Sequence, residues 1–299
     1  MIRTSFSTLG CPDWSFTELI EYGSDAGFDG VEIRLLERET DLLAVPAFQP
    51  SRLSERRREL TEGGFRVCGI ASSVAFDSPD ATERQRQVDV GRANLDLAAE
   101  LEADVVRVFG DIIRETVGRE ALVDQVAEGL DRLGEYAEPL GLTVVIETHG
   151  DFADSRLTRD TLQRVNSDAV GVLWDTHHPW RFCGESLPET FENFGRWVRH
   201  THWKDSISMP RHEVDAAGTA ATDEADALMG GHETADYVLF GGGEFPVIEC
   251  LGLLAGSGYE GWYSLEWEKM WHPDLEGPEV ALPLFSPKLR ELHGLVSGG

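Results

Sequence analysis

Lysine is scarce in this chain of 299 residues. Only three of its 26 basic side chains are lysines, at positions 204, 269 and 288, and the others are arginines. Acidic side chains number 54, which gives a formal net charge of -28 at pH 7. A protein that binds nucleic acid through phosphate contacts needs a basic face, and no basic cluster of that kind is visible. The composition therefore disfavours nucleic-acid partners.

This excess of acid, with arginine in place of lysine, is typical of proteins from salt-loving organisms. The salt of their cytoplasm screens charge repulsion beyond about 3 Å at 1 M. An acidic protein from an ordinary environment is the alternative interpretation. Under the halophilic interpretation, the net charge reflects the solvent and says little about partners.

Cysteines and long apolar runs are also few. The four cysteines, at 11, 68, 183 and 250, show no CxxC pairing, which disfavours a disulfide framework or a cysteine-ligated zinc site. No stretch approaches the roughly 20 apolar residues of a membrane span. The start MIRTSFSTLG lacks the basic and apolar regions of a secretion signal. We therefore expect a soluble, cytoplasmic protein that has no membrane partner.

Eight short segments rich in β-branched and aromatic residues alternate with segments of helical periodicity. Three of the helical segments, 15–27, 121–141 and 246–258, end at the glycine expected after a helix C-terminus. Eight such units over this length predict a (β/α)8 TIM barrel in a single domain spanning 1–299. A doubly wound open sheet is the alternative, but no glycine-rich phosphate loop follows the first strand. The predicted strands are 3–10, 30–36, 66–73, 104–110, 142–150, 170–178, 197–205 and 262–268.

Residues 206–244 interrupt the seventh unit with a segment rich in glycine, alanine and acidic residues. The segment is longer than an ordinary connection between a strand and a helix. We expect a lid over the active end of the barrel, or a subunit contact in a homo-oligomer. A surface insertion without a role is the alternative.

Polar residues occur near the carboxyl ends of the last four predicted strands, where TIM barrels hold their chemistry. They are Glu147, Asp175, His202 and Glu266. The first three are 28 and 27 positions apart, which is one βα unit each. This spacing predicts that the three lie at matching heights on neighbouring strands.

Side-chain alternation predicts which residues of the last two strands face inward. In WVRHTHWKD, His200, His202 and Lys204 share one parity, with His200 one layer below and Lys204 one layer above. In YSLEWE, Glu266 and Glu268 share the inward parity with Ser264. Buried carboxylates and imidazoles are costly unless they are paired or bound to a cation.

Three carboxylates and an imidazole at one barrel mouth predict a divalent metal site. Ligation by oxygen with one nitrogen suits Mn²⁺, Mg²⁺ or Co²⁺, with Zn²⁺ as an alternative. A buried ion-pair network that involves Arg34 and Arg107 is the competing interpretation. Glu32 and Arg34 are predicted to pair with each other inside the barrel.

The motifs VVIETHG, LWDTHH, HTHWKDS and YSLEWE resemble those of the xylose isomerase-like TIM barrels. That family includes sugar and sugar-phosphate isomerases, ketose 3-epimerases and inosose dehydratases. The resemblance implies substrate contacts from His178, favoured over His177 by its spacing, and from Lys204. The DNA-repair endonuclease branch, which adds histidines at strands two to four, does not fit this chain. The resemblance implies that one divalent ion is held by Glu147, Asp175, His202 and Glu266.

Four more residues are assigned by position. His149 is a candidate substrate contact, with a capping role as the alternative. Trp14 is a candidate apolar wall over a sugar ring, with core packing as the alternative. Glu268 and His200 are candidates for hydrogen bonding to the metal ligands.

These residues together predict proton abstraction next to a carbonyl of a small carbohydrate, through a metal-stabilised enediolate. Glu147 and Glu266 would act as general base and general acid. The predicted activity is that of a sugar or sugar-phosphate isomerase or epimerase. A dehydratase of the inosose type, a sugar-binding barrel without catalysis and a metal-dependent hydrolase are the alternatives.

Overall fold

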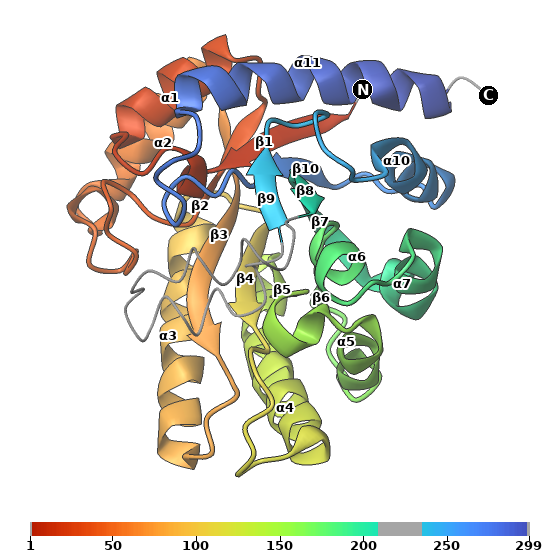
Figure 1. Ribbon diagram of the computed structural model, residues 1–299. Helices are drawn as coiled ribbons and strands as arrows, with labels where there is room; N and C mark the ends of the chain where they lie inside the picture. The colour runs from red at the N-terminus through yellow and green to blue at the C-terminus, as the bar shows by residue number, and fades with distance from the viewer. Residues whose placement is uncertain (1, 209–234, 298–299) are drawn as a thin grey trace.

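The structure, a computed structural model, describes residues 2–208 and 235–297. Eight parallel strands close into a barrel in the order β1-β10-β7-β6-β5-β4-β3-β2, with helices around the outside (Figure 1). The predicted (β/α)8 barrel is therefore confirmed. The barrel strands are β1 (Arg3–Ser7), β2 (Gly30–Ile33), β3 (Arg66–Ala75), β4 (Val105–Phe109), β5 (Thr143–Glu147), β6 (Val170–Asp175), β7 (Val198–Trp203) and β10 (Trp262–Leu265).

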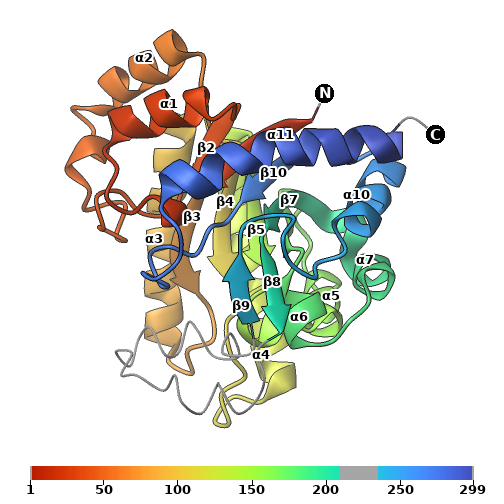
Figure 2. The same ribbon diagram turned by 45° about the horizontal axis from the view of Figure 1, so that its top comes forward.

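The connections between barrel strands contain the helices. In both views α3 and α4 lie beside each other on one flank, and α11 passes over the β1 end of the barrel (Figures 1 and 2). The α-helices are α1 (Phe16–Asp25), α2 (Leu53–Gly63), α3 (Ala81–Glu100), α4 (Arg119–Ala137), α5 (Ser155–Leu162), α6 (His178–Phe182), α7 (Leu187–Phe194), α10 (Val247–Gly256) and α11 (Pro278–Ser297). The 3-10 helices are η1 (Thr8–Gly10), η2 (Pro46–Phe48), η3 (Glu138–Leu140), η4 (Gly150–Ala153) and η5 (Gly195–Trp197).

Local signals in the sequence fix where α1 begins and ends. Ser15 accepts the backbone N–H of Glu18, and the Glu18 carboxylate accepts the backbone N–H of Ser15, which forms a capping box. Gly27 then adopts a φ of 80°, a left-handed conformation that favours glycine. The helix therefore presents Leu19 and Ile20 to the core over a defined length.

The barrel interior is built in layers that follow side-chain alternation. Val105, Val145 and Leu173 form a small apolar cluster of their own, separate from the large core between strands and helices. Two residues further along the same strands stand Arg107, Glu147 and Asp175, the next positions with the same parity. An apolar layer thus supports a charged layer at the carboxyl ends of the strands.

Seven of the eight strands end earlier than the sequence predicted, whereas β3 extends to Ala75, two residues beyond its predicted end. The segment 3–10 is strand only to Ser7, whose side chain accepts the backbone N–H of Leu9 and caps η1. Thr8 Oγ1 then accepts the backbone N–H groups of Arg34 and Leu35 at 2.9 and 3.0 Å. This contact ties the segment after β1 to the segment after β2 and fixes the backbone of Arg34.

After β7 the chain forms a second, two-stranded antiparallel sheet from β8 (Asp205–Ser208) and β9 (Ala235–Val238). The Asp205 carboxylate accepts the backbone N–H groups of Gly241, Gly243 and Phe245 at 2.9–3.0 Å, which closes the base of this hairpin. Of the predicted insertion 206–244, residues 209–234 lie outside the described residues. The lid and subunit-contact roles therefore remain predictions.

Membrane association was disfavoured on the sequence. No helix within residues 2–208 and 235–297 combines the length and the apolar character that crossing a membrane requires.

Candidate metal and substrate site

Four of the predicted site residues converge at the carboxyl ends of the strands. One potential ligand atom from each of Glu147, Asp175, His202 and Glu266 lies within 4.8 Å of the other three, and all four residues are buried. Strand register pairs Asp175 with His202, but it pairs Glu147 with Leu173. Asp175 and His202 are therefore paired across neighbouring strands at the predicted matching height, whereas Glu147 is not paired with Asp175. The stagger of tilted barrel strands still lets the side chain of Glu147 reach the group.

His202 stands at the centre of the cluster and uses both ring nitrogens. Its Nδ1 lies 3.3 Å from Glu147 Oε1 and 3.1 Å from Glu266 Oε2. Its Nε2 lies 2.9 and 3.0 Å from the two carboxylate oxygens of Glu32 on β2. Glu32 thus holds the imidazole from behind and directs Nδ1 toward the other carboxylates.

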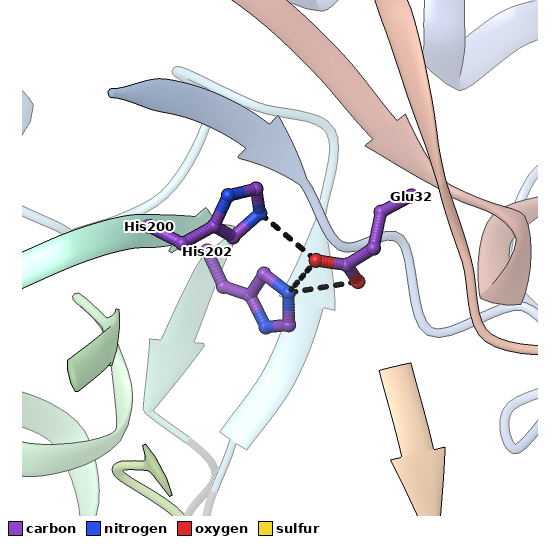
Figure 3. A group of neighbouring side chains, drawn as sticks. All are labelled: Glu32, His200 and His202. Carbon is purple, nitrogen blue, oxygen red and sulfur yellow. Dashed lines mark hydrogen bonds and ion pairs between the residues drawn. The ribbon is translucent and has the colours of Figure 1, made fainter. Parts of the chain in front are cut away.

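The Glu32 carboxylate also meets a second histidine (Figure 3). Its Oε2 lies 2.9 Å from Nε2 of His200, and all three side chains are buried. The sequence predicted that Glu32 pairs with Arg34, and this prediction was wrong. Glu32 and Arg34 share a strand parity, but the histidines of β7 reach Glu32 across the barrel.

Lys204 is surrounded by carboxylates. Its Nζ donates to Glu266 Oε2 at 2.6 Å and to Glu268 Oε1 at 2.7 Å, and it lies 2.8 Å from Asp175 Oδ2. The side chain is 1% exposed. A buried ammonium with three acidic neighbours stays charged, and these neighbours hold the pKa of Lys204 well above its usual range although burial opposes this.

The acidic groups divide by their pKa. Burial raises the pKa of Asp175 to about 6 and that of Glu268 to about 7, although Lys204 lies close to both. Burial also opposes ionisation of Glu266, but the charges of His202 and Lys204 hold its pKa well below the usual range. For Glu147 burial is likewise outweighed, chiefly by Arg107, which lowers its pKa. Glu147 and Glu266 are therefore ionised at neutral pH.

Asp175 has two oxygens with different surroundings. Its Oδ1 accepts the backbone N–H groups of His177 and His178 at 2.9 and 3.0 Å. Its Oδ2 is buried and lies 2.8 Å from Lys204 Nζ, but in a direction that makes no hydrogen bond. The turn after β6 thus fixes one oxygen and leaves the other directed at the cluster.

The histidines around this turn separate as follows. His178 borders the pocket above the cluster, its Nδ1 lies 3.0 Å from the carbonyl oxygen of Thr148, and its Nε2 lies 3.2 Å from Lys204 Nζ. His177 points elsewhere, with Nε2 2.7 Å from Ser206 Oγ. His149 borders the same pocket as His178.

Trp14 is not brought to this pocket. It packs against Phe6 and Tyr22 and borders a different surface hollow, beside α1 and α11. The candidate role as a wall over a sugar ring is therefore corrected to packing, which was the stated alternative. Trp271, which follows the turn after β10, is the tryptophan that lines the pocket.

The pocket at the barrel mouth is lined by acidic, basic and apolar residues, and one basic residue, Arg107, contacts an acidic one, Glu147. Sequence reasoning missed the apolar residues and treated the arginines only as ion-pair partners. Alternation along β4 could have found Arg107 and Phe109, which share the inward parity of Val105. The lining residues are Leu9, Arg34, Arg107, Phe109, Glu147, His149, His178, Glu266, Glu268 and Trp271.

The donors of the cluster fit a divalent cation. Ligand atoms around an ion with bonds of about 2.1 Å lie at most about 4.2 Å apart. The four donors within 4.8 Å are close to that arrangement, and the buried Oδ2 of Asp175 is an acceptor without a hydrogen bond. Three carboxylates and one imidazole are a donor set for Mn²⁺, Mg²⁺, Co²⁺ or Zn²⁺.

Fold and site together define a class, the (β/α)8 barrels with a candidate metal site of three carboxylates and one histidine at the carboxyl ends of the strands. Residues 20–283 match the family described as xylose isomerase-like TIM barrel. The chain belongs to this family, as its motifs indicated.

Relatives of the chain include dehydratases and epimerases. An inosose dehydratase from Clostridium botulinum is 27% identical over 161 residues, which are 53% of this chain and 49% of that protein. The match thus spans about half the length of this curated relative. Two solved structures share the fold: the IOLI protein with a bound zinc atom (16% identity, TM-score 0.74, covering 99% and 98% of the two chains) and D-psicose 3-epimerase with D-tagatose from Clostridium cellulolyticum (15% identity, TM-score 0.73, covering 99% of each).

Proposed function

We propose that the protein is a divalent-metal-dependent isomerase or epimerase of a sugar or related polyhydroxy carbonyl compound. The observation that supports this most directly is the convergence of Glu147, Asp175, His202 and Glu266 beneath a pocket. The zinc atom bound to the IOLI protein, which has the same fold, agrees with a metal here. When bound, the cation would act as a Lewis acid on the carbonyl oxygen of the substrate.

The side chains supply the rest of the reaction. Glu147 is ionised, borders the pocket, and is held by Arg107 at 3.2 Å, so it suits removal of a proton from the carbon next to the carbonyl. Glu266, whose Oε2 lies 3.1 Å from the same His202 Nδ1, is ionised as well, so it takes a proton from Lys204 Nζ, 2.6 Å away, before it gives one to the substrate. Return to the neighbouring carbon gives isomerisation, and return to the opposite face of the same carbon gives epimerisation.

Lys204 and His178 suit the substrate oxygens. The Lys204 ammonium contacts Glu266 and Glu268, which line the pocket, and can donate to a hydroxyl or carbonyl oxygen of a substrate bound there. His178 Nε2 lies 3.2 Å from it and can share that proton. The carbonyl oxygen of Thr148 fixes the orientation of the His178 ring through Nδ1.

A dehydratase of the inosose type is the second candidate. It is favoured by the match to inosose dehydratase and by Lys204, which could protonate a departing hydroxyl after the proton is removed. The same residues remove the same proton in both reactions. The difference lies in whether a β-hydroxyl leaves.

Incubation in D₂O tests the proposal. The Mn²⁺-loaded protein is mixed with ketoses, ketose phosphates and inososes, and mass spectrometry follows deuterium uptake and loss of water. Uptake with an isomer or epimer as product supports the first candidate, and loss of water supports the second. A protein that binds these compounds without exchanging any proton would contradict both and favour a sugar-binding barrel.

A further inference from the structure

Arg34 is a buried cation that has no carboxylate at ion-pair distance among the described residues. It follows β2, its side chain is 95% buried, and its Nη1 makes no hydrogen bond within the described part of the chain. Among residues 2–208 and 235–297, no carboxylate oxygen is recorded within 4.0 Å of its guanidinium. Burying an unpaired charge costs several kcal/mol, so a native protein that keeps one needs a reason for it.

The carboxylates that Arg34 faces at longer range are already paired. Glu32 contacts His200 and His202, Glu147 contacts Arg107 and His202, and Glu266 contacts His202 and Lys204. Among the described residues, Arg34 is thus a cation of the site that has no carboxylate of its own at ion-pair distance. Its backbone N–H is held by Thr8 Oγ1 at 2.9 Å, so the position of the side chain is supported by the fold.

A second arginine faces the same pocket. Arg107 on β4 is 2% exposed, lies over the Phe109 ring at 3.8 Å and uses one end of its guanidinium on Glu147. Burial, and after it the positive charge of Arg107, lowers the pKa of Arg34 to about 10. Two guanidiniums that repel each other at one pocket wall are stabilised when an anion binds between them.

We propose that the substrate carries a carboxylate at the end remote from its reacting carbonyl, and that Arg34, assisted by Arg107, binds this carboxylate. The inference rests on the proposed function and narrows its substrate to keto sugar acids. The carbonyl end would lie over the acidic cluster, and the carboxylate end would lie against the arginine wall.

A carboxylate suits this wall better than a phosphate group. The flat fork of a guanidinium matches the two oxygens of a carboxylate. Phosphate sites usually add backbone N–H groups from a glycine-rich turn or a helix N-terminus. Here the arginines share the pocket lining with Leu9, Phe109 and Trp271, whose side chains are apolar or aromatic.

Three compounds with one carbon skeleton test the inference: D-fructose, D-fructuronate and D-fructose 6-phosphate differ only at carbon 6. Titration calorimetry on the Mn²⁺-loaded full chain, at constant high KCl, gives their dissociation constants. We expect D-fructuronate to bind at least about tenfold more tightly than D-fructose, as a charge-assisted bidentate contact predicts. The affinity of D-fructose 6-phosphate should exceed that of D-fructose by a smaller factor than the affinity of D-fructuronate does.

Variants locate the contact. Arg34→Gln should bring the D-fructuronate to D-fructose affinity ratio close to one, and Arg34→Lys should leave an intermediate ratio. Arg58→Gln on the exposed face of α2 is the matched control and should keep the wild-type ratio. Because a carboxylate could also bind the metal itself, a ratio that survives Arg34→Gln overturns the inference.

The outcomes separate this inference from the proposed function. Equal affinities for D-fructose and D-fructuronate in the wild type, or no binding of either, overturn the carboxylate assignment. So does tighter binding of D-fructose 6-phosphate. Deuterium exchange on D-fructose without any preference for D-fructuronate keeps the proposed function and removes the inference. Tight, Arg34-dependent binding of D-fructuronate without deuterium exchange keeps the carboxylate assignment and contradicts the proposed function.

Discussion

The two sides of the barrel mouth handle charge in opposite ways. On the side of β5, β6, β7 and β10, each carboxylate of the cluster has a cationic or imidazole neighbour within 3.4 Å. On the side of β2 and β4, Arg34 has no carboxylate at ion-pair distance within the described residues, and Arg107 has Glu147. The carboxylates of the acidic side are thus positioned by charged neighbours within the protein. Arg34 lacks such a neighbour among the described residues, which is the observation behind the proposed carboxylate contact.

The largest expected effect tests the acidic side. Glu147→Gln and Glu266→Gln each remove a carboxylate that moves a proton, and we expect the rate of deuterium exchange to fall roughly 10²- to 10⁴-fold. Glu192→Gln, at an exposed position of α7, is the matched control. Exchange at the wild-type rate in either of the first two variants would remove that residue from the acid–base role.

The next prediction tests whether the acidic side depends on β2. Glu32→Gln removes the carboxylate that holds Nε2 of His202, so Nδ1 is less well directed. We expect Mn²⁺ affinity, measured by calorimetry, to fall about 10- to 100-fold. Circular dichroism checks that the variant is folded. Unchanged affinity would show that His202 is oriented without Glu32.

A pH series tests the burial of Asp175. Its pKa is about 6 when folded and about 3.9 when unfolded, so the folded state holds more protons between these values. Its contribution to the free energy of unfolding therefore falls as pH rises from 4 to 6. In the presence of EDTA, Asp175→Asn should gain stability over the wild type by on the order of 2 kcal/mol between pH 4 and pH 8.

Urea unfolding at each pH gives this difference. A difference that stays flat across the series would mean that the Asp175 carboxyl titrates normally. Added Mn²⁺ should reduce the fall in the free energy of unfolding of the wild type as pH rises, because a bound cation favours the ionised carboxylate.

The smallest effect concerns the arginine side. Arg34→Gln removes a buried charge that has no carboxylate at ion-pair distance within the described residues, so we expect the thermal midpoint of the ligand-free protein to stay the same or rise by a few degrees. Arg107→Gln removes the partner of the Glu147 carboxylate and should lower it. A large loss of stability in Arg34→Gln would identify Arg34 as a structural cation and end the contrast between the two sides.

Much of this arrangement was predictable because it depends on short-range periodicity. Alternation and βα spacing located the eight strands and grouped Glu147, Asp175, His202 and Glu266 at one end of the barrel. Seven of the eight strand ends were placed too late, since polar residues such as Thr8 end a strand through contacts with distant segments.

Side-chain contacts between strands on different sides of the barrel could not be predicted from the sequence. Glu32 and His202 are 170 positions apart, so local parity favoured Arg34 as the partner of Glu32. The unpaired state of Arg34 follows only when the neighbours of each carboxylate are known. Trp14 and Trp271 are equally aromatic in the sequence, and only the closed barrel shows which of them borders the pocket.

The hydrogen bonds of Asp205 at the base of the β8–β9 hairpin make the pairing of the two strands independent of the length of the segment between them. Ser208 pairs with Ala235, so both ends of the intervening segment are held together independently of its length. A Cβ at Gly243 would lie 2.2 Å from Asp205 Oδ1, so these hydrogen bonds constrain one sequence position beyond the hairpin. Each doubling of such a segment costs only about 0.6 kcal/mol in closure entropy. The number of residues between positions 208 and 235 can therefore change while the pairing of β8 with β9 is kept.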